Sequence, residues 1–199
     1  MSNISIVTSL NKNILDSKNQ HVIDSTLKHC KDYDFYVCNE NSFLDENVNV
    51  EGAINIDLFK AIPDLKSFLE ESEFKNCHKI GKQDTQEYLN NTHEYLSNNH
   101  YWNRNAIFWF RKVCSLFVVA EKCKSDLLIW LDSDILVQKP LDQKFTDFIS
   151  QYDICSISRK NFSGWMFTDT GIISFNLRAA GKNFIRAFLE IFTSGEAFK

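Results

Sequence analysis

Two aspartates, Asp132 and Asp134, follow an unbroken apolar run and are the residues of this sequence best suited to chemistry. The run, Leu127–Leu131, is typical of a strand buried on both faces. Ligands of open α/β sheets bind outside the carboxyl ends of the strands, which is where these two carboxylates would lie. Because like charges this close repel, a hard divalent cation such as Mg²⁺ or Mn²⁺ would stabilise the pair. The motif therefore predicts a metal site that docks phosphate oxygens.

Alternating strands and helices are expected around this motif. The expected strands are Ile4–Leu10, Tyr33–Cys38, Ala53–Leu58, Asp126–Leu131, Asp153–Ser158 and Thr170–Leu177. The expected helices are Asp16–His29, a helix beginning near Pro63, Trp102–Lys122, Asp142–Ser150 (capped by Asp142) and Arg178–Phe198. The remaining segments are an insertion at Asn76–Asn99 with a helix near Thr85–Leu96, and a polar, aromatic loop at Arg159–Asp169. The order predicts one α/β domain over residues 1–199, with a mostly parallel central sheet flanked by helices.

Composition excludes several classes of protein. The chain has 199 residues, 44% of them hydrophobic, which suits a globular domain with a sizeable core. Its net charge of −4 gives no broad basic surface for nucleic acid. No signal peptide and no transmembrane segment is evident, so we expect a cytoplasmic protein. The six cysteines show neither a C-x-x-C pair nor zinc-ligand spacing, and we expect reduced, mostly buried thiols.

Two kinds of side chain near the motif have both a structural and a functional interpretation. Arg111 and Lys112 lie in a helix that is apolar on nearly all sides, and one of them would hold a phosphate. From the helix alone, a solvated stripe with salt bridges is the better interpretation. Trp130, inside the apolar strand, is expected to be a core residue. Trp165, in the polar loop, would either stack on a sugar ring or pack over the edge of the domain.

The residues around the aspartate pair resemble a motif of a known family. Leu131-Asp132-Ser133-Asp134-Ile135-Leu136-Val137 is similar to the Asp-x-Asp signature of GT-A-fold glycosyltransferases, in its Leu-Asp-x-Asp-x-Leu-Val form. The upstream basic helix of that family is matched by Phe110-Arg111-Lys112-Val113, and its downstream strand by Asp169–Leu177. The first strand, which ends in Thr8-Ser9, resembles the family's nucleotide-binding first turn. The four pieces occur in the family's order over most of the chain.

The resemblance implies a GT-A-like, Rossmann-like fold and a metal-dependent glycosyltransferase. The donor would be a nucleoside-diphosphate sugar, with a UDP-sugar favoured, and the acceptor a glycan, lipid or protein. Asp134 would ligate Mn²⁺ or Mg²⁺ directly, Asp132 would contact the metal or the ribose, and Asp169 would be the catalytic carboxylate. The implied nucleotide-sugar contacts are Thr8, Ser9, Asn39, Arg111, Asp132, Ser133, Trp165 and Gly171.

Two departures from the family pattern leave alternatives open. Relatives often use a further His ligand beyond the last helix, but this sequence has no His after His100. Either water completes the metal site or the chain lacks a C-terminal portion. The sequence also has Asp169-Thr170-Gly171 where some relatives have Asn-Ala-Gly, which bears on the role of Asp169.

Two other functions remain as alternatives. A phosphatase with an aspartyl nucleophile also carries Asp-x-Asp after an apolar strand. Its pair normally lies near the start of the chain and is followed by Thr or Val at the place that Leu136 occupies here. The other alternative is a catalytically inactive domain that still binds sugar nucleotides.

Overall fold

The computed structural model describes residues 3–12, 15, 19–39, 48–63, 65, 100–160 and 166–194; for 100–108, 159–160 and 166–169 it describes the backbone alone. The strands are β1 (Ile4–Leu10), β2 (Asp34–Asn39), β3 (Ile54–Asp57), β4 (Leu127–Leu131), β5 (Ile154–Lys160) and β6 (Met166–Asn176). The helices are α2 (Gln20–His29), α3 (Leu58–Ala61), α8 (His100–Lys122), α9 (Gln143–Ile149) and α10 (Gly181–Thr193).

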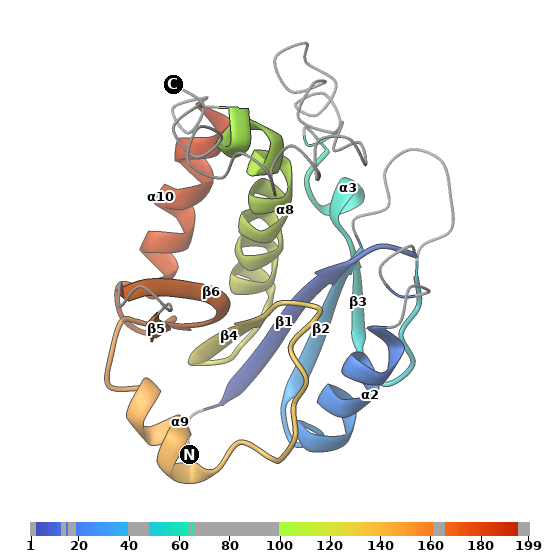
Figure 1. Ribbon diagram of the computed structural model, residues 1–199, viewed down its shortest axis with the longest axis vertical. Helices are drawn as coiled ribbons and strands as arrows, with labels where there is room; N and C mark the ends of the chain where they lie inside the picture. The colour runs from blue at the N-terminus through green and yellow to red at the C-terminus, as the bar shows by residue number, and fades with distance from the viewer. Residues whose placement is uncertain are drawn as a thin grey trace.

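The strands form a six-stranded sheet in the order β3-β2-β1-β4-β6-β5 (Figure 1). β1 pairs in parallel with β2 and β4, and β2 pairs in parallel with β3. β6 runs antiparallel to β4, and β5 runs antiparallel to β6. The prediction of an α/β fold with a mostly parallel sheet is confirmed. The carboxyl ends of β1 to β4 meet along one side of the sheet, which we call the carboxyl edge.

Helices cover both faces of the sheet. On one face, α8 and α10 lie side by side and pack against Val7, Trp130 and Phe175 (Figure 1). On the other face, Ile23 of α2 and Ile149 of α9 pack with alternate residues of the same central strands. Every residue of β4 is buried, as expected for an apolar run between two helical layers. Asp132, the first polar residue after this buried run, directly follows the end of β4.

Two of the predicted helices agree closely with the structure, and a third is shorter than predicted. The predicted helix Trp102–Lys122 is confirmed as α8. The predicted cap of α9 is confirmed, since Oδ1 of Asp142 accepts a hydrogen bond from the amide of Phe145 at 2.7 Å. α10 is shorter than the prediction of Arg178–Phe198, and residues 195–199 lie outside the described part of the chain.

Three expectations for residues 53–99 are either corrected by the structure or lie mostly outside the residues that it describes. The strand expected to reach Leu58 ends at Asp57, because the Asp57 side chain caps α3 through the amides of Phe59 and Lys60. The predicted helix after Pro63 and the insertion at Asn76–Asn99, with its helix near Thr85–Leu96, lie outside the described residues apart from isolated positions.

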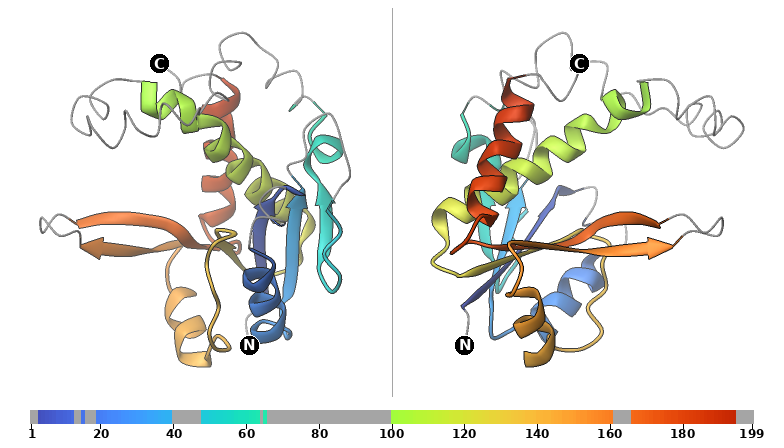
Figure 2. Two further views of the ribbon diagram at one scale, coloured as in Figure 1. Left: turned by 45° about the vertical axis from the view of Figure 1, so that its right-hand side comes forward. Right: turned by 90° about the vertical axis from the view of Figure 1, so that its left-hand side faces the viewer.

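The prediction of a loop at Arg159–Asp169 is partly wrong. β5 continues to Lys160 and β6 already begins at Met166, so the two strands form a hairpin that projects beyond the other strands of the sheet (Figure 2). Pairing between the strands satisfies the backbone of these residues whatever the polarity of their side chains. The ladder is irregular between Ser156 and Ile157, and β6 carries extra residues there.

Candidate functional site

The aspartate pair lies on a short turn at the carboxyl edge. The amide of Ile135 donates to the carbonyl oxygen of Asp132 at 3.0 Å, which closes a turn with Ser133 and Asp134 at its centre. The amide of Asp132 donates to the carbonyl oxygen of Gly171 in β6 at 2.8 Å. Asp134 is exposed, whereas Asp132 and Ser133 are partly buried. The turn is thus closed by one hydrogen bond, joined to β6 at Asp132 by the other, and presents Asp134 to solvent.

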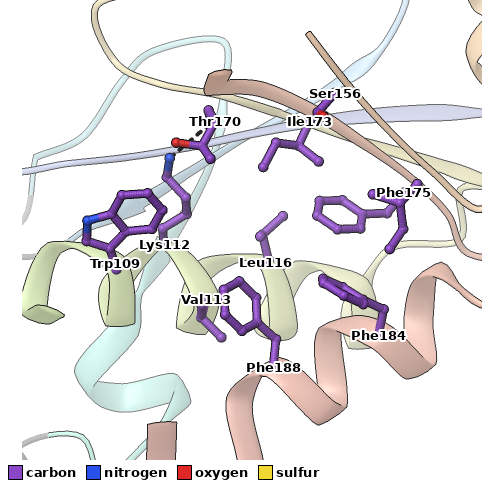
Figure 3. Close-up of a pocket in the computed structure, with 11 residues that line it drawn as sticks. Trp109, Lys112, Val113, Leu116, Ser156, Thr170, Ile173, Phe175, Phe184 and Phe188 are labelled. Atoms are coloured by element: carbon purple, nitrogen blue, oxygen red, sulfur yellow. Dashed lines mark hydrogen bonds between the residues drawn. The ribbon is translucent and has the colours of Figure 1, made fainter. Parts of the chain in front are cut away.

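The carboxylate of Asp132 is held by two donors. Nζ of Lys112 lies 2.8 Å from its Oδ1, and Nε1 of Trp130 donates to the same oxygen at 2.6 Å. Lys112 also donates to the carbonyl oxygen of Thr170 at 3.0 Å, and Figure 3 shows its side chain rising from α8 toward Thr170. The strand places Trp130 and Asp132 on the same side, because residues two apart in an extended chain face the same way.

The basic residue that meets the aspartate is Lys112. Arg111 is buried within α8, with 6% of its surface exposed, and its carbonyl oxygen accepts a hydrogen bond from Oγ of Ser115 at 2.8 Å. Neighbouring residues of a helix point about 100° apart, so the two basic side chains leave α8 in different directions. The expectation that Arg111 supports the diphosphate stays a prediction.

Two other predicted contacts, Thr8 and Asn39, come together at the ends of β1 and β2. Leu10 pairs with Asn39, and Thr8 pairs with Val37, so alternation places Thr8 and Asn39 on the same face of the sheet. Both side chains are buried, and neither Oγ1 of Thr8 nor Oδ1 of Asn39 has a hydrogen-bond partner in the described part of the chain. Buried polar atoms without a partner are uncommon and point to a missing water or ligand. Ser9 is also buried, on the opposite face.

The oxygen donors at the turn suit a hard cation shared with a substrate. No group of three or more His, Cys, Asp or Glu residues is placed to hold a metal within the described ranges. Mg²⁺, however, is usually held by one or two carboxylates together with substrate phosphates and water. Asp134 and the second oxygen of Asp132 match that donor set. The residues therefore fit a metal that needs the nucleotide to complete its coordination.

The remaining predicted site residues are Asp169, Trp165 and Gly171, and the structure describes them to different extents. Asp169 lies on β6 opposite Ile157 of β5, two residues before Gly171, and only its backbone is described. Trp165 lies outside the described residues. Gly171 contributes its carbonyl oxygen to Asp132, a role that the resemblance did not assign. The sequence prediction did not identify the bond from Trp130 to Asp132, although their spacing in a strand would have suggested it.

An apolar cavity of about 230 Å³ lies behind Lys112 on the same face of the sheet. Figure 3 shows Val113 and Leu116 of α8, Ile173 and Phe175 of β6, and Phe184 and Phe188 of α10 around it. The polar residues in its lining are Lys112, Ser156 and Thr170. With so few polar groups, the cavity does not suit a phosphate.

Two of the buried thiols in the described part of the chain, Cys30 and Cys114, are held protonated. Its cysteines are free of disulfides, and Cys30, Cys38 and Cys114 are buried. Burial raises the pKa of Cys30 to about 11. Burial also raises the pKa of Cys114, with Cys38 nearby adding to the effect and Arg111 opposing it. Thiols held protonated in this way are poor nucleophiles, so Cys30 and Cys114 offer no alternative chemistry.

Comparisons with known proteins give a fold. No family model and no curated protein matches the sequence. A transferase with two cysteine-to-serine substitutions aligns with a TM-score of 0.50 and 12% identity over 96% of this chain and 78% of its own. The glycosyltransferase GlyE of Streptococcus pneumoniae TIGR4 aligns with a TM-score of 0.47 and 15% identity over 98% of this chain. The galactosyltransferase LgtC, solved with donor and acceptor sugar analogues, aligns with a TM-score of 0.45 and 12% identity over 98% of this chain.

At identities this low, the likeness shows the α/β fold alone. This chain spans 40% of the GlyE chain and 63% of the LgtC chain. Separately, none of the helices in the described residues has the length and apolar character that crossing a membrane requires.

Proposed function

We propose that this chain is a metal-dependent glycosyltransferase domain that uses a nucleoside-diphosphate sugar, with a UDP-sugar favoured as donor. The supporting observation is the turn that carries Asp132 and Asp134 at the carboxyl edge, anchored to β6 through Gly171 and braced by Lys112. A carboxylate pair at this edge suits a metal-bound diphosphate. The resemblance of the motif to GT-A-fold enzymes adds support. The acceptor is a glycan, a lipid or a protein.

The two aspartates have different proposed roles. Asp134 is exposed at the centre of the turn and ligates Mn²⁺ or Mg²⁺ directly. Asp132 turns its second oxygen toward the metal or the ribose. The bound ion would neutralise the charge that develops on the departing nucleoside diphosphate. Ser133, between the two aspartates, contacts the nucleotide. Arg111 adds positive charge that supports the diphosphate.

Residues at the ends of β1 and β2 hold the nucleoside in this proposal. Thr8 offers a hydroxyl that donates or accepts, Asn39 offers a carbonyl oxygen that accepts, and both atoms lack a partner in the described part of the chain. Ser9 contributes from the same strand end. A base with an N–H group beside its carbonyls, as in uracil, suits such a pair.

The sugar and the acceptor are assigned to the side of the turn that faces β6. Asp169 is the proposed catalytic carboxylate, which takes a proton from the acceptor hydroxyl. Trp165 and Gly171 are proposed to contact the sugar. Asp169 lies two residues before Gly171, which bonds directly to Asp132, so its backbone is close to the proposed metal site.

Release of nucleoside diphosphate from a panel of UDP- and GDP-sugars tests the proposal. We expect release with Mn²⁺, none with chelator, and a loss of at least about tenfold in Asp134→Asn. Asp147→Asn is the matched control, because Asp147 is an exposed aspartate on α9 away from the carboxyl edge. Hydrolysis of a simple phosphate monoester in place of sugar nucleotides would favour the phosphatase instead. Metal-dependent binding without release would favour the inactive domain.

A further inference from the structure

The ammonium group of Lys112 is already occupied by protein groups. It has three N–H donors, and two oxygens of the protein accept from it, Oδ1 of Asp132 at 2.8 Å and the carbonyl oxygen of Thr170 at 3.0 Å. The rings of Trp109 and Trp130 lie 5.5 and 5.0 Å from Nζ, within cation–π range. The side chain is 14% exposed. Lys112 therefore has little capacity left to bind a phosphate itself.

The polar atoms of Asp132 are engaged except for one. Its amide donates to Gly171, and its carbonyl oxygen accepts from Ile135. Its Oδ1 accepts from both Lys112 and Trp130. Within the described ranges, Oδ2 alone has no partner, and the side chain is 34% exposed. The carboxylate is thus locked in orientation with one oxygen turned to the protein and the other available to a ligand.

We propose that Lys112 and Trp130 are positioning residues that fix the carboxylate of Asp132 with Oδ2 toward the ligand. Lys112 acts on nucleotide binding through Asp132 and does not touch the phosphates. This inference rests on the proposed function, because it assigns the ligand of Oδ2 to a metal-bound nucleotide. When a protein side chain is already held in its binding geometry before the ligand arrives, an entropic cost is removed from the binding step.

The placement of charge supports the same role. A mostly buried ammonium is costly unless it is paired, and Asp132 provides the pair. In turn, Lys112 offsets the repulsion between Asp132 and the nearby Asp134 before any cation arrives. The indole N–H adds direction, because it donates to the same oxygen, Oδ1, that Lys112 contacts. The charge of Lys112 on α8 and the indole N–H of Trp130 on β4 together hold the Asp132 side chain in one rotamer.

A double-mutant cycle separates positioning from direct contact. The affinity for UDP with Mn²⁺ is measured by calorimetry in the wild type, Lys112→Met, Asp132→Asn and the double variant. We expect Lys112→Met to weaken binding about tenfold, a coupling of roughly 1.4 kcal/mol, and to cause no further loss when Asp132 is already Asn. Equal losses in both backgrounds would show direct phosphate contact and overturn the inference. Lys122→Met, an exposed lysine of the same helix, is the matched control.

The indole N–H resonance of Trp130 provides a readout that does not depend on nucleotide. Trp130→Phe identifies it in a ¹H–¹⁵N spectrum. We expect the resonance to move in Asp132→Asn and in Lys112→Met, and to stay in place in Lys122→Met. An unmoved resonance in Asp132→Asn would overturn the inference even if nucleotide binds. If Lys112→Met does not fold, Lys112→Gln, which keeps a polar group, is used in both measurements.

These readouts separate the failure of this inference from failure of the proposed function. A wild-type protein that binds no nucleotide, but whose Trp130 resonance responds as expected, contradicts the glycosyltransferase proposal and confirms the locked geometry of Asp132. Normal nucleotide binding with equal losses in both backgrounds contradicts the positioning role and leaves the proposed function standing.

Discussion

The amide nitrogen of Asp132 lies 2.8 Å from the carbonyl oxygen of Gly171, and this hydrogen bond joins the aspartate turn to β6. The antiparallel strand therefore reaches the carboxyl edge from the opposite direction and supplies a backbone acceptor where the parallel strands end. A turn held in this way stays in place when its exposed side chain is changed. We accordingly expect substitutions at Asp134 to alter ligand binding without altering the fold.

Replacing Thr8 by Val should stabilise the protein without ligand and weaken its binding of nucleotide. The Thr8 hydroxyl is buried without a partner in the described part of the chain, so its removal relieves a desolvation cost of about 1 kcal/mol. Urea unfolding of the ligand-free protein measures the change. Thr26→Val is the control, because the buried Thr26 hydroxyl donates to Val22 at 3.2 Å and its loss should destabilise. A destabilised Thr8→Val protein would contradict the assignment of Thr8 as a ligand contact.

Replacing Glu121 by Gln should lower stability at neutral pH and have less effect in acid. Glu121 of α8 contacts Arg186 and Lys182 of α10, with oxygen–nitrogen distances of 2.7 and 3.2 Å. Burial raises the pKa of Glu121, but hydrogen bonds from Arg186 and Lys182 outweigh it and hold the pKa below its usual 4.5. The stabilisation is thus present above pH 4.5 and is lost as the pH falls through the lowered value.

The carboxylate of Glu121 is one-third exposed, so the expected cost at pH 7 is only about 0.5 kcal/mol and shrinks in high salt. Unfolding curves of the wild type and Glu121→Gln at pH 7 and pH 3 measure it. A difference that grows toward pH 3 would contradict the assigned ion pairs.

Replacing Gly181 by Ala should destabilise the fold by about 1–3 kcal/mol. A Cβ at Gly181 would lie 2.6 Å from the carbonyl oxygen of Asn176 and 2.9 Å from that of Asp153. Both are backbone atoms at the junction of β6, β5 and α10. The steric clash can therefore be relieved only if the helix shifts. Thermal unfolding measures the loss, and Asn183→Ala, an exposed position of the same helix, should change stability little.

Removing the cap of α9 should cost about 1 kcal/mol. Oδ1 of Asp142 accepts the amide of Phe145 at 2.7 Å, and Asp142→Ala leaves that amide without its acceptor. Asp142→Asn keeps an oxygen in the same place and should retain most of the stability. Equal losses in the two variants, by urea unfolding, would mean that the charge of Asp142 matters and its cap does not.

The elements of the core were predictable because their patterns are local. The apolar run Leu127–Leu131 identifies a strand buried on both faces whatever its neighbours, and the structure confirms it. Asp142 likewise marks the start of α9 through a bond within its own helix. The hairpin beyond Ser158 was missed, because polar and aromatic residues there form strands only through pairing with each other.

The partner of Asp132 was harder to predict. α8 is apolar on nearly all sides, so its sequence does not reveal which of Arg111 and Lys112 faces β4. Packing against the sheet makes that choice and favours Lys112. Trp130 was predicted as core and is 2% exposed, yet its N–H also reaches Asp132, a role that follows from strand alternation together with the turn.

The most direct test of the central claim is calorimetric titration of the protein with UDP and GDP, in Mn²⁺ and in chelator, for wild type and Asp134→Ala. The proposed site predicts nucleotide binding that requires the metal and falls by at least about tenfold in Asp134→Ala, with the unfolding curve unchanged. Nucleotide binding that is equally tight in chelator and in Asp134→Ala, or no binding under any of these conditions, would contradict the proposal.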